Sequence, residues 1–450
     1  MKMSAENNKC KPQGSQKERV DFTQLALKHK ALNLGQGFPD YPPPKFVTDA
    51  LVEVANSPNY FLHQYTREFG HPRLVSAIAK LYSQLIDREI NPQTEVLITL
   101  GAFGAIFCSI NGHVDVGDEV IIIEPSYTCY EPIVRTAGGV PRFIPLRLRK
   151  RNDGQLATSA DWVLDKEELE GMFNSKTKII VLNTPHNPLG KVFKREELES
   201  IADLCKKWNV LCISDEVFEW VVYKPNKHIR IGKLMFYSIY YTHLVILLMD
   251  NKMNQATLPG MWERTITIGS AGKTFGVTGW KVGWAYSPAN LMVNLQIVHQ
   301  SCVYMMNTPI QEAVAISFEK EIARLDQDEC YFNCIPNDLE AKRDYMVEFL
   351  KDVGMEPTVP EGGYVVLADW SPLESLVDLS SEKDKYRDFR FTGWMTKNVG
   401  LQAIPSSVFY SEPNKTLAEH FVRFCFWKKD QTLQKAAQLL NKWNNNTKNK

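Results

Sequence analysis

The sequence lacks any excess of charge of one sign. Its 52 lysine and arginine residues equal its 52 aspartate and glutamate residues, so the formal net charge is zero. A neutral chain offers no bulk electrostatic attraction to nucleic acid or to an anionic membrane. Neither is therefore expected as a partner, and small charged molecules are the more natural substrates.

Secretory signals and closely spaced metal-binding cysteines are also missing. The first twenty residues, MKMSAENNKCKPQGSQKERV, contain no apolar core of the kind that marks a signal peptide. The nine cysteines are scattered, with no CxxC pair and no paired histidines near them. Such a pattern favours reduced thiols over a zinc site or a disulfide framework. We expect no metal and a cytoplasmic protein, with the mitochondrion as the alternative.

Short apolar runs alternate with helical patterns from about residue 48 onward. The 450 residues suggest two or three domains, and a hydrophobic content of 44% is ordinary for globular chains. The pattern predicts an α/β fold, with a mostly parallel sheet covered by helices. The expected strands are EVLITL (95–100), DEVIIIEP (118–125), TKIIVLNTP (177–185), VLCISDE (210–216) and KVGWAYS (281–287), and RTITIGSAGK (264–273) is expected to end one more strand in a loop.

The two ends of the chain differ from this middle part. Residues 32–47 are rich in glycine and proline, and we expect them to be extended rather than helical. The last third, with GGYVVLADW and FVRFCFW, suggests a smaller α+β domain. We therefore expect an N-terminal tail and arm over 1–44 that packs with the small domain, a large domain over 45–325 and a small domain over 326–450.

The stretch GSAGKTFGVTGW (269–280) contains Gly-Lys-Thr, which invites interpretation as a nucleotide-binding loop. That loop needs a glycine five residues before Gly272, and Thr267 stands there. A surface lysine in a glycine-rich turn is the simpler alternative. The small residues around Lys273 would instead let a flat ring approach, and a desolvated lysine is a standard nucleophile for an aldehyde cofactor.

Polar residues directly follow several of the expected strands. Gly101, the segment 183–187, Asp215 and the loop 270–273 all come at strand ends. Ligands of open α/β sheets bind outside the carboxyl ends of the strands, so these groups can meet in one crevice. Separately, Arg423 lies among apolar residues in FVRFCFW. An arginine there is costly unless an anion meets it, and its fork suits a carboxylate. A structural ion pair is the alternative.

Many motifs together resemble one family. LGQGFPDYPPP, QYTREFG, EVIIIEPSYTCYEP, NTPHNPLGKVF, SDEVFEW, LPGMWERTITIGSAGKTF and FVRFCF are similar to the kynurenine aminotransferases, also called cysteine-S-conjugate β-lyases. These belong to the class I/II aminotransferases that use pyridoxal phosphate, and the likeness runs from about 20 to 445. It implies a fold-type I homodimer that transfers the amino group of L-kynurenine, or of another aromatic, glutamine-like or sulfur amino acid, to a 2-oxo acid. Kynurenic acid would be the product, and β-lyase activity a side reaction. Another fold-type I enzyme, such as an aminocyclopropane-carboxylate synthase or a decarboxylase, is the alternative.

The resemblance assigns roles to individual residues. Lys273 would bind the cofactor covalently and later move the substrate proton, and Asp215 would keep the pyridine nitrogen protonated. Asn187 would contact the ring oxygen and the substrate carboxylate, which Arg423 would bind beside Gly37. The remaining cofactor contacts would come from Gly101, Ala102, Phe103, Ser270 and Lys281 at the phosphate, from Tyr127 stacked on the ring, and from Tyr65 of a neighbouring subunit.

Two features depart from the family pattern. Phe218 stands where the family usually has a tyrosine whose hydroxyl donates to the ring oxygen. We expect its absence to raise the pKa of the cofactor-bound Lys273 nitrogen and to slow transamination without abolishing it. The second feature is the added segment 232–255, GKLMFYSIYYTHLVILLMDNKMNQ, which is too short and too polar to span a membrane. We interpret it as a retained intron, whose product could be an impaired, non-catalytic isoform.

Overall fold

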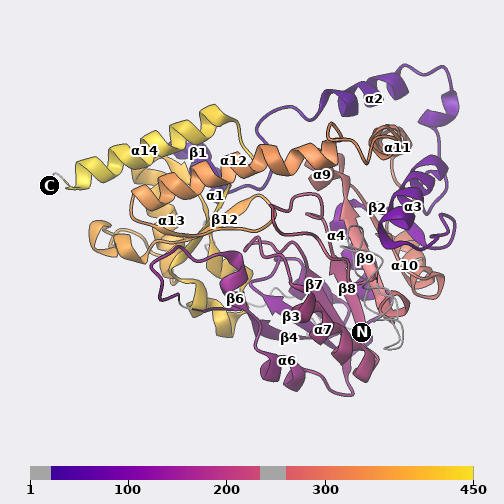
Figure 1. The fold of residues 1–450 in the computed structure, drawn as a ribbon, viewed down its shortest axis with the longest axis horizontal. Helices are drawn as coiled ribbons and strands as arrows, with labels where there is room; N and C mark the ends of the chain where they lie inside the picture. The colour runs from indigo at the N-terminus through magenta and orange to yellow at the C-terminus, as the bar shows by residue number, and fades with distance from the viewer. Residues whose placement is uncertain (1–21, 150, 234–259, 449–450) are drawn as a thin grey trace, which may run out of the picture.

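Two sheets organise the chain. The computed structural model describes residues 22–149, 151–233 and 260–448 (Figure 1). The large sheet has seven strands in the order β2-β10-β9-β8-β7-β3-β4, and only β10 runs antiparallel to its neighbours. The expected mostly parallel sheet is therefore confirmed. The strands are β2 (Val96–Leu100), β3 (Glu119–Glu124), β4 (Val140–Pro145), β7 (Thr177–Asn183), β8 (Leu211–Asp215), β9 (Thr265–Ser270) and β10 (Val282–Tyr286).

Helices bury both faces of the large sheet. Side chains alternate along β3, so that Val120 and Ile122 join a core with α4, α5 and α10, whereas Ile121 and Ile123 join a core with α6 and α7. Towards β2, the second face is covered by α3 and α11. This two-sided burial explains why the strands are near-continuous apolar runs. The helices are α3 (Pro72–Ile86), α4 (Gly101–Asn111), α5 (Tyr130–Thr136), α6 (Lys166–Met172), α7 (Arg195–Trp208), α10 (Ala289–Cys302) and α11 (Thr308–Ile322).

A smaller antiparallel sheet lies at the other end of the molecule. Its order is β11-β12-β15-β14, and in Figure 1 α12, α13 and α14 gather around it, away from α3 and α10. The short strand β1 (Leu32–Asn33) pairs with β13 (Leu401–Gln402), which ties the N-terminal arm to this end. The elements are β11 (Glu356–Thr358), β12 (Val365–Asp369), β14 (Ile404–Pro405), β15 (Phe421–Cys425), α12 (Tyr331–Asp352), α13 (Arg387–Asn398) and α14 (Asp430–Lys448).

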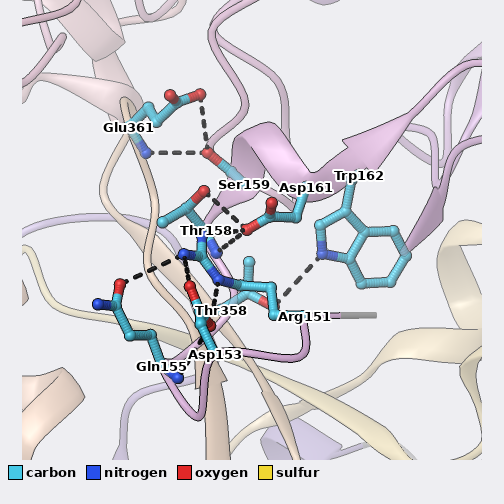
Figure 2. Close-up of polar contacts among 9 residues, drawn as sticks. All are labelled: Arg151, Asp153, Gln155, Thr158, Ser159, Asp161, Trp162, Thr358 and Glu361. Atoms are coloured by element: carbon cyan, nitrogen blue, oxygen red, sulfur yellow. Dashed lines mark hydrogen bonds and ion pairs between the residues drawn. The ribbon is translucent and has the colours of Figure 1, made fainter. Parts of the chain in front are cut away.

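The segment 158–162, called the strap below, is bonded to the residues that connect β11 and β12 of the small sheet (Figure 2). Thr158 and Val359 form a parallel bridge. The Ser159 hydroxyl donates to the Glu361 carboxylate at 3.3 Å and accepts from the Glu361 backbone N–H at 3.0 Å. Trp162 Nε1 donates to the Thr358 hydroxyl at 3.4 Å. These bonds fix the segment that leads directly into β12.

The carboxyl ends of the parallel strands share one edge of the large sheet. β2, β7, β8 and β9 end there at Leu100, Asn183, Asp215 and Ser270. Because β10 runs the opposite way, its beginning lies at this edge, which brings Lys281 there as well. The expected meeting of strand-end residues is thus confirmed by the topology.

Some expectations need correction or fall outside the described residues. The stretch 32–47 is not extended throughout, because helix α2 (Lys45–Ala55) begins directly after Pro44. The three prolines restrict the residues before the helix, and proline is tolerated just ahead of a first turn. Residues 1–21 and all but the first two residues of the segment 232–255 lie outside the described residues. Within the described part, no helix is long and apolar enough to cross a membrane.

We predict that Gly283→Ala destabilises the fold. A Cβ at Gly283 would lie 2.3 Å from the Gly101 carbonyl carbon, so β10 and the start of α4 would be forced apart. Overpacking of this kind costs about 1–3 kcal/mol. Urea unfolding measures the change. The matched control is Gly279→Ala, whose Cβ would meet nothing within 4 Å and should alter stability by less than about 0.5 kcal/mol. Equal effects of the two substitutions would contradict the prediction.

Candidate active site

A cavity of about 180 Å³ opens at the shared edge of the large sheet. It collects most of the residues that the sequence singled out. Gly37 and Arg423 are not on its wall but contact residues that are. Tyr65 lies apart from it. The lining comprises Gly101, Ala102, Phe103, Ile106, Tyr127, Asn183, Asn187, Asp215, Val217, Phe218, Ser270, Gly272, Lys273, Thr278, Lys281 and Val282.

Lys273 is the amine of this cavity. It stands on the single helical turn α9 (Ala271–Thr274), which follows β9 directly. Its Nζ donates to the Gly37 carbonyl at 3.3 Å and lies 5.7 Å from the centre of the Tyr364 ring. Burial lowers the pKa of Lys273 to about 8, and the positive charges of Arg423 and Lys281 act in the same direction. A substantial unprotonated fraction at neutral pH makes this amine a nucleophile.

Asp215 is the carboxylate of the same cavity. It ends β8 and is buried, and burial raises its pKa to about 6. A hydrogen bond from the Tyr130 hydroxyl to Oδ2 at 2.7 Å opposes that rise. Asn183 Nδ2 donates to the Asp215 carbonyl at 2.9 Å, which joins the ends of β7 and β8. The carboxyl group is therefore mostly ionised at pH 7 and can hold a cationic ring nitrogen.

The start of α4 and Lys281 form a cradle for an anion. Gly101 has φ +64°, a conformation that glycine adopts at no steric cost, and α4 begins there. Free N–H groups of the first turn and the helix dipole favour a phosphate at this point. A Cβ on Gly101 would approach Lys281 Nζ to 3.4 Å, so the ammonium group lies over the helix start. Ser270 lines the same part of the cavity.

Arg423 reaches the cavity from the small sheet. It is the middle residue of β15, and it is buried. Its Nη1 donates to Asn187 Oδ1 at 3.0 Å and its Nη2 to the Gly35 carbonyl at 2.9 Å, while Nε has no hydrogen-bond partner within the described chain. No carboxylate pairs with it among the described residues. Within that part of the chain the structure shows no ion pair for Arg423, and a guanidinium group in this position can bind a carboxylate.

Aromatic rings form the remaining wall. Tyr127 lies on the cavity wall at the loop after β3, edge-on to Tyr130 at 6.0 Å. Phe218 also lines the cavity and packs edge-on against Tyr364, with the ring centres 4.9 Å apart. The Tyr364 hydroxyl donates to the Gly37 carbonyl at 3.2 Å, so the ring fixes the turn that Lys273 also contacts.

Tyr65 is the one predicted residue that the single chain leaves outside. Its side chain is 84% exposed, and its ring lies 6.3 Å from that of Tyr304. Tyr60 and Phe61 are exposed beside it. An exposed aromatic patch of this kind is typical of a protein–protein interface.

Several residues that shape this site had no role assigned to them from the sequence. Tyr130, Asn183 and Tyr364 make contacts that connect distant parts of the chain. Lys428, which is buried, donates to the carbonyls of Gln36 and Phe38 on either side of Gly37. Asn183 was expected in the crevice as part of the strand-end segment 183–187, whereas no local signal marked the other three residues.

The donor set fits pyridoxal phosphate. An amine of lowered pKa, an ionised carboxylate, an anion cradle and two aromatic walls surround one small cavity, and each matches a different part of that molecule. Lys273 would hold its aldehyde carbon, Asp215 its ring nitrogen, and the start of α4 with Lys281 its phosphate. The guanidinium group of Arg423 would bind the carboxylate of a substrate beside the cofactor.

The chain is similar to known proteins along nearly its whole length. The family model for aminotransferase class I and II matches residues 29–440. The chain is 51% identical to kynurenine–oxoglutarate transaminase 3 of Homo sapiens, over 94% of this chain and 87% of that protein. It is 46% identical to kynurenine–oxoglutarate transaminase 1 of Homo sapiens, over 94% and 95%. The crystal structure of Bna3p from Saccharomyces cerevisiae matches with a TM-score of 0.83 at 31% identity, over 94% and 95%.

We predict that cofactor uptake by the cofactor-free protein depends on pH through Lys273. Only the unprotonated amine attacks the aldehyde, so the rate should rise with pH and level off above about pH 8, the pKa to which burial lowers this group. Visible absorbance after addition of pyridoxal phosphate follows the reaction, with Lys273→Ala as the control that shows no uptake at this site. A rate that keeps rising towards pH 10 would contradict the burial of Lys273.

We also predict a spectroscopic effect of Phe218→Tyr. The added hydroxyl would lie on the cavity wall and donate to the ring oxygen of the cofactor, so the pKa of the cofactor-bound Lys273 nitrogen should fall by about one unit. Titration of the visible absorbance measures this pKa. An unchanged value would show that the phenylalanine at this position is neutral for the cofactor.

Proposed function

This chain belongs to the class I and II aminotransferases, a family that implies pyridoxal phosphate, and on that premise we propose that its amino donor is L-kynurenine and its acceptor a 2-oxo acid. Aminotransferases pass an amino group from an amino acid to an oxo acid. The keto product of kynurenine would cyclise to kynurenic acid. The names of the human relatives support kynurenine as donor, and other aromatic, glutamine-like or sulfur amino acids are further candidates.

Arg423 is the observation on which the proposal rests. A buried guanidinium whose fork meets only an amide oxygen and a carbonyl can take a carboxylate bidentately. Amino acids and 2-oxo acids share that carboxylate, so one anchor serves both halves of the reaction. Asn187 would add a donor from its amide group once the carboxylate has engaged the arginine.

Lys273 would transfer the substrate proton, and Asp215 would keep the ring nitrogen of the cofactor protonated. Pyridoxal phosphate, when bound, withdraws electrons from the substrate α-carbon. Lys273 Nζ, at a pKa of about 8, can accept the proton from that carbon and return it elsewhere. Asp215 keeps its charge through the Tyr130 hydrogen bond and would hold the ring nitrogen protonated. Tyr127 and Phe218 would offer aromatic surface to the ring of the cofactor.

We further propose that two copies of the chain complete each site. The exposed aromatic patch at Tyr60, Phe61 and Tyr65 supports this, with Tyr65 reaching the phosphate in the neighbouring subunit. Each copy would consist of a large domain over 45–325 and a small domain that combines the arm with 326–450. The cytoplasm is the compartment that we propose. With a good leaving group on the β-carbon, the same site would act as a cysteine-S-conjugate β-lyase.

The test is formation of kynurenic acid by the protein loaded with pyridoxal phosphate. Arg423→Gln should raise KM for both kynurenine and 2-oxoglutarate by about ten- to hundred-fold, because hydrogen bonds to charged groups are lost. Chromatography of kynurenic acid gives the rates. The matched control is Arg149→Gln, an exposed arginine away from the cavity, which should leave both KM values unchanged.

Two outcomes would contradict the proposal. Loaded protein that makes no kynurenic acid, but releases carbon dioxide or cyclises its substrate, would support another enzyme of the same fold. Protein that retains no cofactor absorbance after addition of pyridoxal phosphate and removal of the unbound excess would support an impaired product of the added segment.

A further inference from the structure

Glu124 is a buried carboxylate that the reaction proposed above does not use. It ends β3, and its side chain has an exposed fraction of 0%. No ion pair involves it among the described residues. A buried charge without a partner cation is expensive unless hydrogen bonds replace its lost water. An apolar residue would fill such a position at lower cost, so the carboxylate calls for a specific explanation.

The hydrogen bonds to the Glu124 carboxylate come from the small-sheet end of the molecule. The backbone N–H of Ser411 donates to Oε1, and Asn414 Nδ2 donates to Oε2 at 2.7 Å. Beside them, the Ser126 backbone N–H donates to the Phe409 carbonyl at 2.7 Å. We call these three bonds the Glu124 clasp. They join the loop after β3 to the turns η6 (Ser406–Phe409) and η7 (Glu412–Ala418).

One half of the clasp leads to the cavity wall, and the other half leads to Arg423. On one side, Tyr127 follows Glu124 by three residues and lines the cavity. On the other side, the Phe409 ring lies 5.0 Å from the guanidinium carbon of Arg423. The same turn is held from behind by Asp388, which accepts from the Ser407 N–H at 2.7 Å and from its hydroxyl at 3.0 Å. Phe409 is therefore fixed between two buried carboxylates.

We propose that Glu124 is a positioning residue, which sets Phe409 and Arg423 at a fixed place relative to Tyr127. The substrate carboxylate then binds Arg423 while the rest of the substrate lies against the Tyr127 wall. This inference rests on the carboxylate-binding role of Arg423 proposed above. It predicts that loss of the clasp weakens recognition of the carboxylate end of a ligand while the cofactor remains bound.

Binding of two matched ligands to the loaded protein tests the inference. 3-Phenylpropionate carries the carboxylate and the ring, and 3-phenylpropanamide has the same shape without the charge. Glu124→Ala should weaken binding of the acid by about tenfold, as expected for the loss of one to two hydrogen bonds that hold the turns η6 and η7. Binding of the amide should change by less than about twofold. Calorimetry gives the affinities, and visible absorbance verifies the cofactor.

Two further variants keep the test decisive if Glu124→Ala fails to fold. Asn414→Ala removes one donor from a partly exposed position and should weaken acid binding by about threefold. Glu124→Gln should retain nearly full acid binding. Its oxygen can accept from the Ser411 N–H, and its amide can donate to Asn414 once that side chain has turned over.

The control for general destabilisation is Glu321→Ala. Glu321 is equally buried and accepts from the Tyr331 N–H at 2.7 Å, but it lies on α11, away from the cavity. The Glu321→Ala substitution should lower the melting temperature and leave the ratio of acid affinity to amide affinity unchanged. A Glu124→Ala protein that keeps the wild-type preference, or that loses both ligands equally, overturns the inference alone. A wild-type protein without any preference for the acid overturns the role of Arg423 first.

Discussion

Burial of an amine and a carboxyl group in one small cavity is the constraint on which the rest of this structure depends. Loss of water pushes both groups towards their neutral forms, so the pKa of Lys273 falls to about 8 and that of Asp215 rises to about 6. An amine near neutrality attacks carbonyl carbon and moves protons. The carboxylate is still charged at pH 7, so it can hold a cationic ring. Desolvation turns two ordinary side chains into a reactive pair.

The sheet provides that dry place because its strands converge on it. Parallel strands end at one edge, where helix starts and loops replace the water. A protonated Asp215 could not hold a cationic ring nitrogen. The Tyr130 hydroxyl, in the first turn of α5, donates a hydrogen bond to Asp215 and thereby stabilises its charged form. The antiparallel direction of β10 matters for the proposed phosphate site. It places Lys281, which directly precedes β10, beside the start of α4.

The sequence predicted six of the seven strands of the large sheet, with β4 missed, and it predicted which strand-end residues meet in the cavity, Lys273 among them. It failed where contacts are distant. Apolar runs and the residues that follow them are local signals, so Asp215 and Lys273 could be chosen beforehand. The bond from Tyr130 to Asp215 joins residues 85 apart, and that from Lys428 to Phe38 joins residues 390 apart. Periodicity reports which face of an element is buried, and it contains no information about which remote polar atom is met there. For the same reason KVGWAYS predicted a strand but not its direction.

The site also depends on a fixed spacing between the two sheets, because Lys273 belongs to one and Arg423 to the other. Arg423 itself bonds across that gap to Asn187 through Nη1, and its Nη2 bonds to Gly35 of the N-terminal arm. A substrate carboxylate would compete for those same Nη groups, so these bonds cannot maintain the spacing while substrate binds. Contacts that the ligand does not touch have to maintain it. The Ser159–Glu361 strap does so at the start of β12, and the Glu124 clasp does so beside Arg423. The buried Glu124 carboxylate is then explained by the turns that it keeps in place.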